Sequence, residues 1–370
     1  MAPDSRLIDR LREEVRSEHP YVVPGAREVP HKLNQNESPF DVPPALKREL
    51  LEAFFQIPFN RYPSEQPARF IEALAAHLGV TPGHILVGNG SNELTHTLGL
   101  CLMRPGRPVV VPRPMFALYE SVIRLFGATV VPVAPRKDLS FDAEGILAAI
   151  ETHDPDVTIV TSPNNPTGLA MTFEEIERIV RSARGFVVVD EAYHEFNPQP
   201  SAMTLLDDHP NLLVVRTLSK AFGLAGLRIG YLVGHPEVMG HMLKARLPFM
   251  VDRMAETVGL TLLRHHTVVE ERIDDIKQSI RELTTALSDM EGVTVVPSDT
   301  NFVMFRTPTD SRALLEQLAD AGVLVRNMGG YPELQGYLRV NAGTDMENKA
   351  FLAALSSALQ PTDPAWNSSR

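Results

Sequence analysis

A single lysine near the middle of the chain stands in a setting that favours chemistry on its amine. Lys220 follows the apolar residues 212–215, and a second apolar run, residues 227–233, begins shortly after it. Two buried strands that converge on one amine reduce its hydration, which favours the neutral form that attacks a carbonyl carbon. This placement predicts imine chemistry at Lys220. By itself, the pattern also fits a lysine at the solvent-facing end of a core strand.

Two further polar side chains follow apolar runs. Asp190 comes directly after residues 186–189, which are all apolar, and a carboxylate there is costly to bury unless it faces a cation. Asn165 stands between Asn164 and Pro166 after the predicted strand 158–161, which makes it a rigid amide donor at a strand end. Both residues are therefore candidates for holding a ligand, although helix caps and Asn-Pro turns explain many such residues.

A pair of glycines predicts an anion site. Gly88 and Gly90 directly follow the predicted strand 85–87, and Ser91 or Asn92 could cap the helix that comes next. Free backbone amides and the helix dipole at such a junction attract a phosphate group. A glycine pair alone is a weak signal, but it gains weight from the cations elsewhere in the chain.

Two arginines near the C-terminal end lie within apolar strand patterns. Arg326 occurs in the sequence VLVRN and Arg339 in YLRVN. A guanidinium group binds a carboxylate or a phosphate through two parallel hydrogen bonds, which fixes orientation as well as affinity. The alternative for each arginine is a satisfied residue at a sheet edge.

The composition is that of an ordinary globular protein. The chain has 370 residues with 44% hydrophobic and 22% charged residues, and its formal net charge is −11. This negative charge argues against broad binding to nucleic acid or to anionic membranes. Cys101 is the only cysteine, and no spacing of histidines suggests a metal site. Without a signal peptide or an apolar run of bilayer length, we expect a cytoplasmic protein with no membrane partner.

Strands and helices alternate regularly in the first two thirds of the chain, which predicts an α/β fold with a mainly parallel, seven-stranded sheet covered on both faces. Ligands of such sheets bind at the carboxyl ends of the strands. The expected strands are residues 85–87, 109–111, 129–133, 158–161, 186–189, 212–215 and 229–233, and the helices that cover them include residues 44–55, 67–78, 117–126, 143–150 and 173–183.

The chain is long enough for two domains. We expect residues 1–35 to be an arm with one short amphipathic helix, which packs on the small domain or on a second subunit. Residues 36–250 would form the large domain. Residues 251–370 would form a small α+β domain, with a helical stretch to about residue 269, a helix over 276–290, a strand over 293–296, a helix over 311–321, a strand over 323–326 and a final helix over 346–359.

The residues around the lysine resemble a known family signature. Ser219 and Lys220, with Gly223 and Arg228 downstream, resemble the lysine motif of the fold-type I pyridoxal-phosphate aminotransferases. The tetrad NPTG at residues 165–168 is a second family motif. The resemblance extends over about residues 32–359, and its motifs occur in the family's order.

This resemblance implies pyridoxal 5'-phosphate as the cofactor and transamination as the reaction. Lys220 would hold the cofactor as an imine and then move the substrate proton, while Asp190 would pair with the ring nitrogen and Tyr193 would donate to the ring oxygen. Phe116 would stack on the ring. The residues that the resemblance assigns to the cofactor are Gly90, Ser91, Asn92, Phe116, Asn165, Asp190, Tyr193, Ser219, Lys220 and Arg228.

Within the family, the sequence resembles the histidinol-phosphate aminotransferase branch. The segment NES, with Asn36, is followed by RYP, with Tyr62. The resemblance implies a homodimer in which Tyr62 reaches the cofactor phosphate of the neighbouring subunit. It also implies histidinol phosphate and 2-oxoglutarate as substrates, with Asn36, Tyr62, Arg326 and Arg339 as substrate-binding residues.

Other functions stay open at this point. Aromatic amino-acid aminotransferases and a threonine-phosphate decarboxylase of cobalamin synthesis share many of these motifs. Phe40 stands where the branch often has a tyrosine. Val251 and Asp252 differ from the residues that the branch commonly has near these positions. A pyridoxal-phosphate-binding regulator would need a DNA-binding domain ahead of residue 30, and the mostly extended arm is too short for one.

Overall fold

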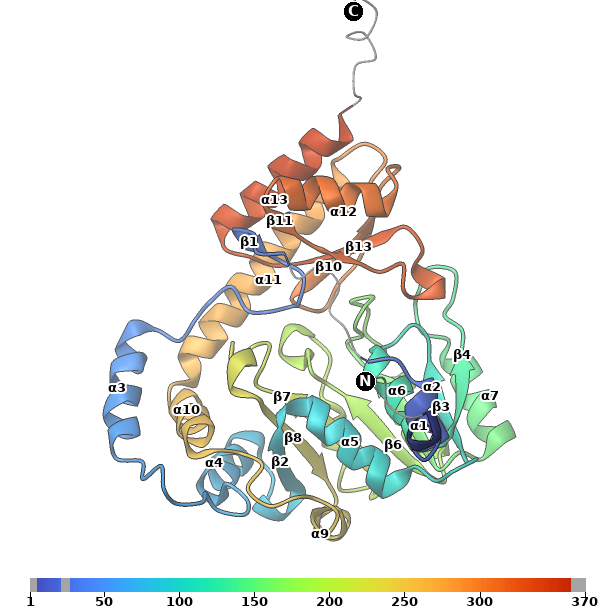
Figure 1. Ribbon diagram of the computed structural model, residues 1–370, viewed down its shortest axis with the longest axis vertical. Helices are drawn as coiled ribbons and strands as arrows, with labels where there is room; N and C mark the ends of the chain where they lie inside the picture. Colours follow the sequence, from blue (N-terminus) through green and yellow to red (C-terminus); the bar gives the residue numbers. More distant parts are fainter. Residues whose placement is uncertain (1–4, 21–26, 361–370) are drawn as a thin grey trace, which may run out of the picture.

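The computed structural model describes residues 5–20 and 27–360, and its largest element is a seven-stranded sheet (Figure 1). The strand order is β2-β8-β7-β6-β5-β3-β4. Only β8 runs antiparallel to its neighbours β2 and β7, so the predicted α/β class and the mainly parallel sheet are confirmed. The strands are β2 (Ile85–Asn89), β3 (Pro108–Pro112), β4 (Thr129–Val133), β5 (Val157–Thr161), β6 (Phe186–Asp190), β7 (Leu212–Thr217) and β8 (Ile229–Gly234).

The central strands are buried on both faces because helices cover both. Every residue of β5, β7 and β8 is buried, which is what runs of valine, isoleucine and leucine require. The helices begin and end near the predicted residues, with boundary shifts of a few positions. They are α3 (Pro44–Phe55), α4 (Ala68–Leu78), α5 (Gly90–Leu102), α6 (Ala117–Leu125), α7 (Ala143–His153), α8 (Phe173–Ser182) and α9 (Pro236–Leu243).

A second, smaller sheet has the order β12-β13-β10-β9. The predicted single strand over residues 323–326 is wrong, because the chain changes sheets there. The first part pairs with β1 (His31–Lys32), and the second part pairs with β13. The strands are β9 (Thr294–Val296), β10 (Phe302–Arg306), β11 (Val323–Leu324), β12 (Arg326–Asn327) and β13 (Tyr337–Asn341), and the helices against them include α12 (Ser311–Asp320) and α13 (Asp345–Leu359).

The helices that link the two sheets differ from the prediction. The helical stretch expected up to residue 269 ends with α9 and resumes as α10 (Arg253–Arg264), and α11 (His266–Ser288) is longer than the predicted helix over 276–290. Asp252 caps α10, since its carboxylate accepts from the backbone amides of Met254 and Ala255. Because α10 packs against α3 and α4, the predicted domain boundary at residue 250 stays a prediction.

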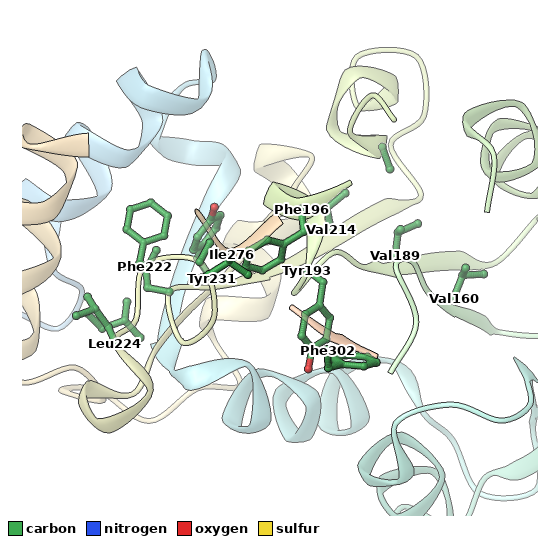
Figure 2. Packing of buried hydrophobic residues seen from close by; sticks show 14 of the residues in the cluster. Val160, Val189, Tyr193, Phe196, Val214, Phe222, Leu224, Tyr231, Ile276 and Phe302 are labelled. Atoms are coloured by element: carbon green, nitrogen blue, oxygen red, sulfur yellow. The ribbon is translucent and has the colours of Figure 1, made fainter. Parts of the chain in front are cut away.

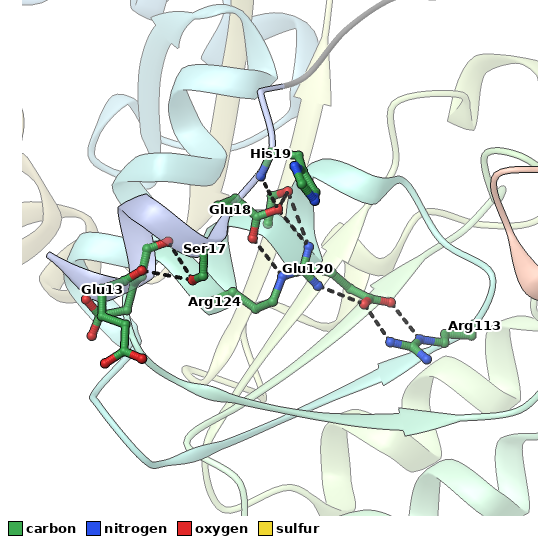
Figure 3. A network of polar contacts seen from close by, with 9 residues as sticks. Glu13, Ser17, Glu18, His19, Arg113, Glu120 and Arg124 are labelled. Atoms are coloured by element: carbon green, nitrogen blue, oxygen red, sulfur yellow. Dashed lines mark hydrogen bonds and ion pairs between the residues drawn. The ribbon is translucent and has the colours of Figure 1, made fainter. Parts of the chain in front are cut away.

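The N-terminal arm contacts both parts of the molecule. It holds two short helices, α1 (Ser5–Ile8) and α2 (Glu13–Ser17), where one was predicted. Glu18 accepts hydrogen bonds from Arg124 of α6, and Arg124 also pairs with Glu120, as Figure 3 shows. Further along, β1 pairs with β11 in a separate two-stranded sheet. The arm thus lies on α6 before it pairs with β11.

One continuous hydrophobic core joins the two sheets. The ring of Tyr193, after β6, meets the ring of Phe302, in β10, edge to face with centroids 5.4 Å apart (Figure 2). Both side chains are buried among the apolar residues of the large sheet and of α11. Over the described ranges, 5–20 and 27–360, no helix has both the length and the apolar content needed to cross a bilayer.

Candidate active site

A pocket of about 1830 Å³ opens at one edge of the large sheet, where the carboxyl ends of β5, β6 and β7 meet the small sheet. Brought together from segments far apart in the sequence, twelve of the predicted site residues line it. They are Asn36, Ser91, Asn92, Phe116, Asn165, Asp190, Tyr193, Ser219, Lys220, Arg228, Arg326 and Arg339.

Lys220 lies in the loop between β7 and β8, as predicted. Its amine donates to the backbone oxygen of Gln35 over 3.2 Å and lies 5.9 Å from the centre of the Tyr193 ring. Burial, with a smaller contribution from the positive charge of Arg339, lowers the pKa of Lys220 to about 8. A substantial fraction of the amine is therefore neutral, and nucleophilic, near neutral pH.

Asp190 ends β6 with its carboxylate buried. One oxygen accepts from the hydroxyl of Tyr119 over 2.8 Å, and the other accepts from the amide of Ala192 over 3.0 Å. Within the part of the chain that the structure describes, no lysine, arginine or histidine pairs with this carboxylate. Burial raises the pKa of Asp190 to about 6. A buried carboxylate at a pocket wall, without a cationic partner, is suited to a cationic ligand.

Sequence reasoning missed Tyr119, which lies in α6 and is fully buried. Burial and the nearby charge of Asp190 raise the pKa of its hydroxyl, so it stays a donor. The only available signal was its position three residues after Phe116, the residue that precedes α6. A generic helix tyrosine has the same spacing.

The predicted anion site has a different cap from the one expected. Asn89, rather than Ser91 or Asn92, is the N-cap of α5, and its side chain makes no capping hydrogen bond. The first amides of α5 are thus left for another acceptor. The side chain of Arg228 closes the other side, because a Cβ added to Gly90 would lie 2.3 Å from its guanidinium group. Ser219 is buried next to them, with its hydroxyl accepting from Thr217 over 3.0 Å.

Asn165 and Arg339 contact each other across the two sheets. The guanidinium group of Arg339 donates to the side-chain oxygen of Asn165 and, over 3.2 Å, to the backbone oxygen of Asn34. The neighbouring Asn164 fixes the turn, since it accepts from Thr161 over 2.6 Å and donates to the backbone of Pro114 over 2.9 Å. With its oxygen so engaged, the side-chain nitrogen of Asn165 is the group left to donate to a ligand.

The two predicted arginines of the small sheet are direct neighbours. Arg326 in β12 lies opposite Arg339 in β13 in an antiparallel register, so both side chains extend from the same face of the sheet. Like charges directly opposite each other are destabilising in a sheet. Among the described residues, Arg326 forms no ion pair with a carboxylate. A bound anion would therefore relieve the repulsion between the two guanidinium groups.

Two of the predicted site residues, Gly90 and Tyr62, do not line the pocket. The side chain of Tyr62 is 79% exposed, and its ring stacks on Phe249 with centroids 4.9 Å apart. Phe40 also lies outside the main pocket and lines a second one, with Arg272 over its ring. Neither Tyr62 nor Phe40 reaches the cluster around Lys220 within this chain.

A buried charge cluster behind β6 was not predicted. Arg216 pairs with Glu191 over 2.7 Å and with Glu195 over 3.4 Å, and all three side chains are largely buried. His194, in the same loop, is also partly buried. Burial lowers the pKa of His194 to about 4 and raises the pKa of Glu195. Removing one member would leave an unpaired buried charge, so the cluster holds the loop after Asp190 in place.

The donor set fits a phosphorylated aromatic aldehyde with a cationic ring. The lysine amine could attack the aldehyde, the buried carboxylate could pair with the ring, and the uncapped amides with an arginine could hold the phosphate. Phe116 lines the same wall and supplies an aromatic surface.

Comparisons with known proteins agree with this arrangement. Residues 30–355 match the family model described as aminotransferase class I and II. A curated histidinol-phosphate aminotransferase of Chlorobium luteolum is 42% identical over 340 residues, which cover 92% of this chain and 95% of that protein.

Solved structures show the same fold. The histidinol-phosphate aminotransferase of Sinorhizobium meliloti, in complex with pyridoxal-5'-phosphate, has a TM-score of 0.85 at 27% identity and covers 94% of this chain and 97% of its own. The L-threonine-O-3-phosphate decarboxylase of Porphyromonas gingivalis has a TM-score of 0.79 at 24% identity, covering 89% and 99%, so the fold alone does not separate these two activities. The extent of the family match shows that the chain belongs to the aminotransferase class I and II family.

Proposed function

We propose that this chain is a pyridoxal-phosphate-dependent transaminase that converts histidinol phosphate and 2-oxoglutarate into imidazole-acetol phosphate and glutamate. The observation that carries the substrate proposal is the pairing of Arg326 with Arg339 at the pocket wall. One clamp of two guanidinium groups fits the phosphate ester of one substrate and the distal carboxylate of the other. The name of the Chlorobium luteolum relative supports the same assignment.

The residues around Lys220 have complementary tasks in this proposal. The bound cofactor supplies an electron-withdrawing ring that stabilises negative charge on the substrate carbon. Asp190 would keep the ring nitrogen protonated by pairing with it, and the Lys220 amine would take and return the substrate proton. Asn165 and Tyr193 would donate to the ring oxygen, and Arg228 with the first amides of α5 would hold the phosphate.

A single-turnover experiment separates the proposed substrate from its competitors. The protein is loaded with pyridoxal phosphate, converted to the amino form with glutamate, and mixed with imidazole-acetol phosphate, phenylpyruvate or 2-oxoglutarate. We expect the phosphorylated ketone and 2-oxoglutarate to restore the aldehyde absorbance faster than phenylpyruvate does. Equal rates for phenylpyruvate and the phosphorylated ketone would show an aromatic aminotransferase instead.

Replacing Arg326 by glutamine tests the anion clamp. The variant loses charged hydrogen bonds to the substrate anion, so kcat/KM for imidazole-acetol phosphate should fall by roughly 10- to 100-fold. The matched control is Arg306→Gln, because Arg306 lines the same pocket but is exposed and lies over the ring of Tyr337. A similar loss in both variants would mean that general positive charge, and not the Arg326 clamp, attracts the substrate.

We also propose that the protein is a homodimer in which Tyr62 completes the site of the partner subunit. Large apolar side chains are exposed shortly before Tyr62 in the sequence and at residues 247 and 249, the second of which stacks on the Tyr62 ring, which supports burial against a second copy. The proposal explains why Tyr62 is exposed and lies outside this chain's own pocket. These exposed side chains are Leu51, Phe55, Phe59, Leu247 and Phe249.

Mixed dimers test the role of Tyr62. Tyr62→Phe should weaken cofactor binding by roughly tenfold or more, through the loss of one hydrogen bond to a charged group. Mixing this variant with Lys220→Ala subunits and isolating the mixed dimers pairs the intact Lys220 of one subunit with the intact Tyr62 of the other. Cofactor affinity at the Lys220 sites should then return to the wild-type value, whereas affinity that stays weak after subunit exchange would show that Tyr62 acts within its own chain.

A further inference from the structure

The segment of residues 33–36 connects the small sheet to the catalytic residues. On the small-sheet side, the backbone of Asn36 donates to the side chain of Asn341 over 3.1 Å and accepts from Asn301 over 3.1 Å. On the large-sheet side, the backbone oxygen of Gln35 accepts from the amine of Lys220. These three contacts of Asn36 and Gln35 thus depend on how the two sheets are placed relative to each other.

Asn36 itself is held in one unusual conformation. Its φ is +54°, in the left-handed region that asparagine tolerates better than most residues, and its side chain is buried. The side-chain nitrogen donates to the hydroxyl oxygen of Tyr193 over 2.8 Å. The backbone bonds from Asn341 and Asn301 therefore fix the direction from which the hydroxyl of Tyr193 receives this hydrogen bond.

We propose that Asn36 is a positioning residue for Tyr193, and that the small sheet, through Asn341 and Asn301, sets the direction in which the Tyr193 hydroxyl donates. This inference rests on the proposed function and assigns Asn36 a role other than the substrate contact expected from the sequence. A tyrosine hydroxyl that accepts from Asn36 through its oxygen can still donate its hydrogen, here to the ring oxygen of the cofactor. A hydroxyl that accepts one hydrogen bond is also a stronger donor in the next.

The bond from Asn36 has a measurable consequence at Lys220. A strong donor at the ring oxygen stabilises negative charge there, so the proton shared between that oxygen and the Lys220 nitrogen is held less tightly. Weakening the donor should raise the pH at which the absorbance of the Lys220-linked cofactor changes. The charged groups that act on Lys220, namely Arg339, Glu37 and Arg228, are unchanged in the variants used below.

The main test uses Asn36→Gly, because glycine accepts the positive φ without strain and adds no charge. In the loaded protein, the pH midpoint of the absorbance change should rise by roughly half to one unit, the size expected for one hydrogen bond. Tyr193→Phe should raise the midpoint as well, and adding Asn36→Gly to Tyr193→Phe should cause no further rise. Asn341→Ala should raise the midpoint by a smaller amount, and again only when Tyr193 is present.

The control is Asn34→Ala, since Asn34 lies in the same buried segment and its hydrogen bond to Arg339 comes from the backbone oxygen, which alanine keeps. This variant should leave the midpoint unchanged. An unchanged midpoint in Asn36→Gly, or an equal rise in the Tyr193→Phe background, would overturn the positioning role. No shift in Asn341→Ala would overturn the link to the small sheet. Absence of any Lys220-linked absorbance in the wild-type protein would overturn the proposed function, and the positioning role with it.

Discussion

Replacing Lys220 by alanine is expected to abolish the covalent attachment of pyridoxal phosphate and to reduce transamination by about 10⁴-fold or more. Lys220 is the amine at the centre of the pocket, and the proposal gives it both the covalent bond to the cofactor and the proton transfer. Borohydride reduction followed by mass spectrometry of the peptides measures the attachment. A reduced adduct on another lysine, with activity retained, would show that the assignment of Lys220 is wrong.

The matched control for this variant is Lys349→Ala, because Lys349 is exposed on α13. It should attach cofactor at the wild-type rate. The pH dependence gives a second readout. Because burial and Arg339 lower the pKa of Lys220 to about 8, the rate of attachment should rise with pH and level off above about pH 8. A rate that keeps rising toward pH 10 would indicate an ordinary, hydrated lysine.

The sequence was sufficient to predict the large sheet and the residues at its edge. Valine-rich runs such as that of β6 have few alternatives to a strand buried on both faces, and the carboxyl ends of parallel strands meet at one edge. This geometry brings Asp190 and Asn165 together once the strand order is known. The resemblance to a known family then predicted their partners Lys220 and Arg228, which lie in the same pocket.

The contacts that orient these residues could not be predicted, because they depend on packing between distant segments. The bond from Tyr119 to Asp190 links residues 71 positions apart, and the bond from Asn36 to Tyr193 links residues 157 positions apart. No sequence pattern singles out Arg216, and only its partners Glu191 and Glu195 show that it is a buried cation. Periodicity gives the face of an element but not the element that packs on it.

The split between β11 and β12 has a similar explanation. Four apolar or basic residues in a row predict one strand, and only the pairing with β1 of the arm divides it. The same division places Arg326 opposite Arg339. The change of pairing partner after residue 324 therefore explains both the wrong strand prediction and the position of the two arginines. A tertiary contact decided the local structure here, which sequence patterns do not report.

Replacing Asp190 by asparagine should lower the catalytic activity and raise the stability of the cofactor-free protein. In the loaded protein, the ring nitrogen loses its anionic partner, and kcat/KM should fall by roughly 10²- to 10³-fold, the usual effect of removing one preorganised charge contact. In the protein without cofactor, the same change removes a buried carboxylate that has no cationic partner, so the folded state should become more stable at neutral pH.

The sign of the stability effect follows from the pKa of Asp190. Burial raises this pKa from 3.8 to about 6, so the folded state binds the proton more tightly than the unfolded chain does. The stability of the cofactor-free wild type should therefore fall as the pH rises from about 4 to 6, and stay level above that. Asparagine does not titrate, so Asp190→Asn should be more stable above pH 6 by up to about 3 kcal/mol, and the difference should vanish near pH 4.

Asparagine can keep both hydrogen bonds of the aspartate, which makes it the sharpest variant. Its oxygen can accept from the amide of Ala192, and its nitrogen can donate to the hydroxyl of Tyr119, which accepts as well as donates. Denaturant unfolding of the cofactor-free protein at pH 4 and pH 7.5 measures the effect. A variant that is less stable at pH 7.5, or one that keeps wild-type activity, would contradict the role of Asp190. We expect the variant to be more stable and to have lost its activity. This combination would mean that the unpaired carboxylate destabilises the fold and is kept because it binds a cationic ligand.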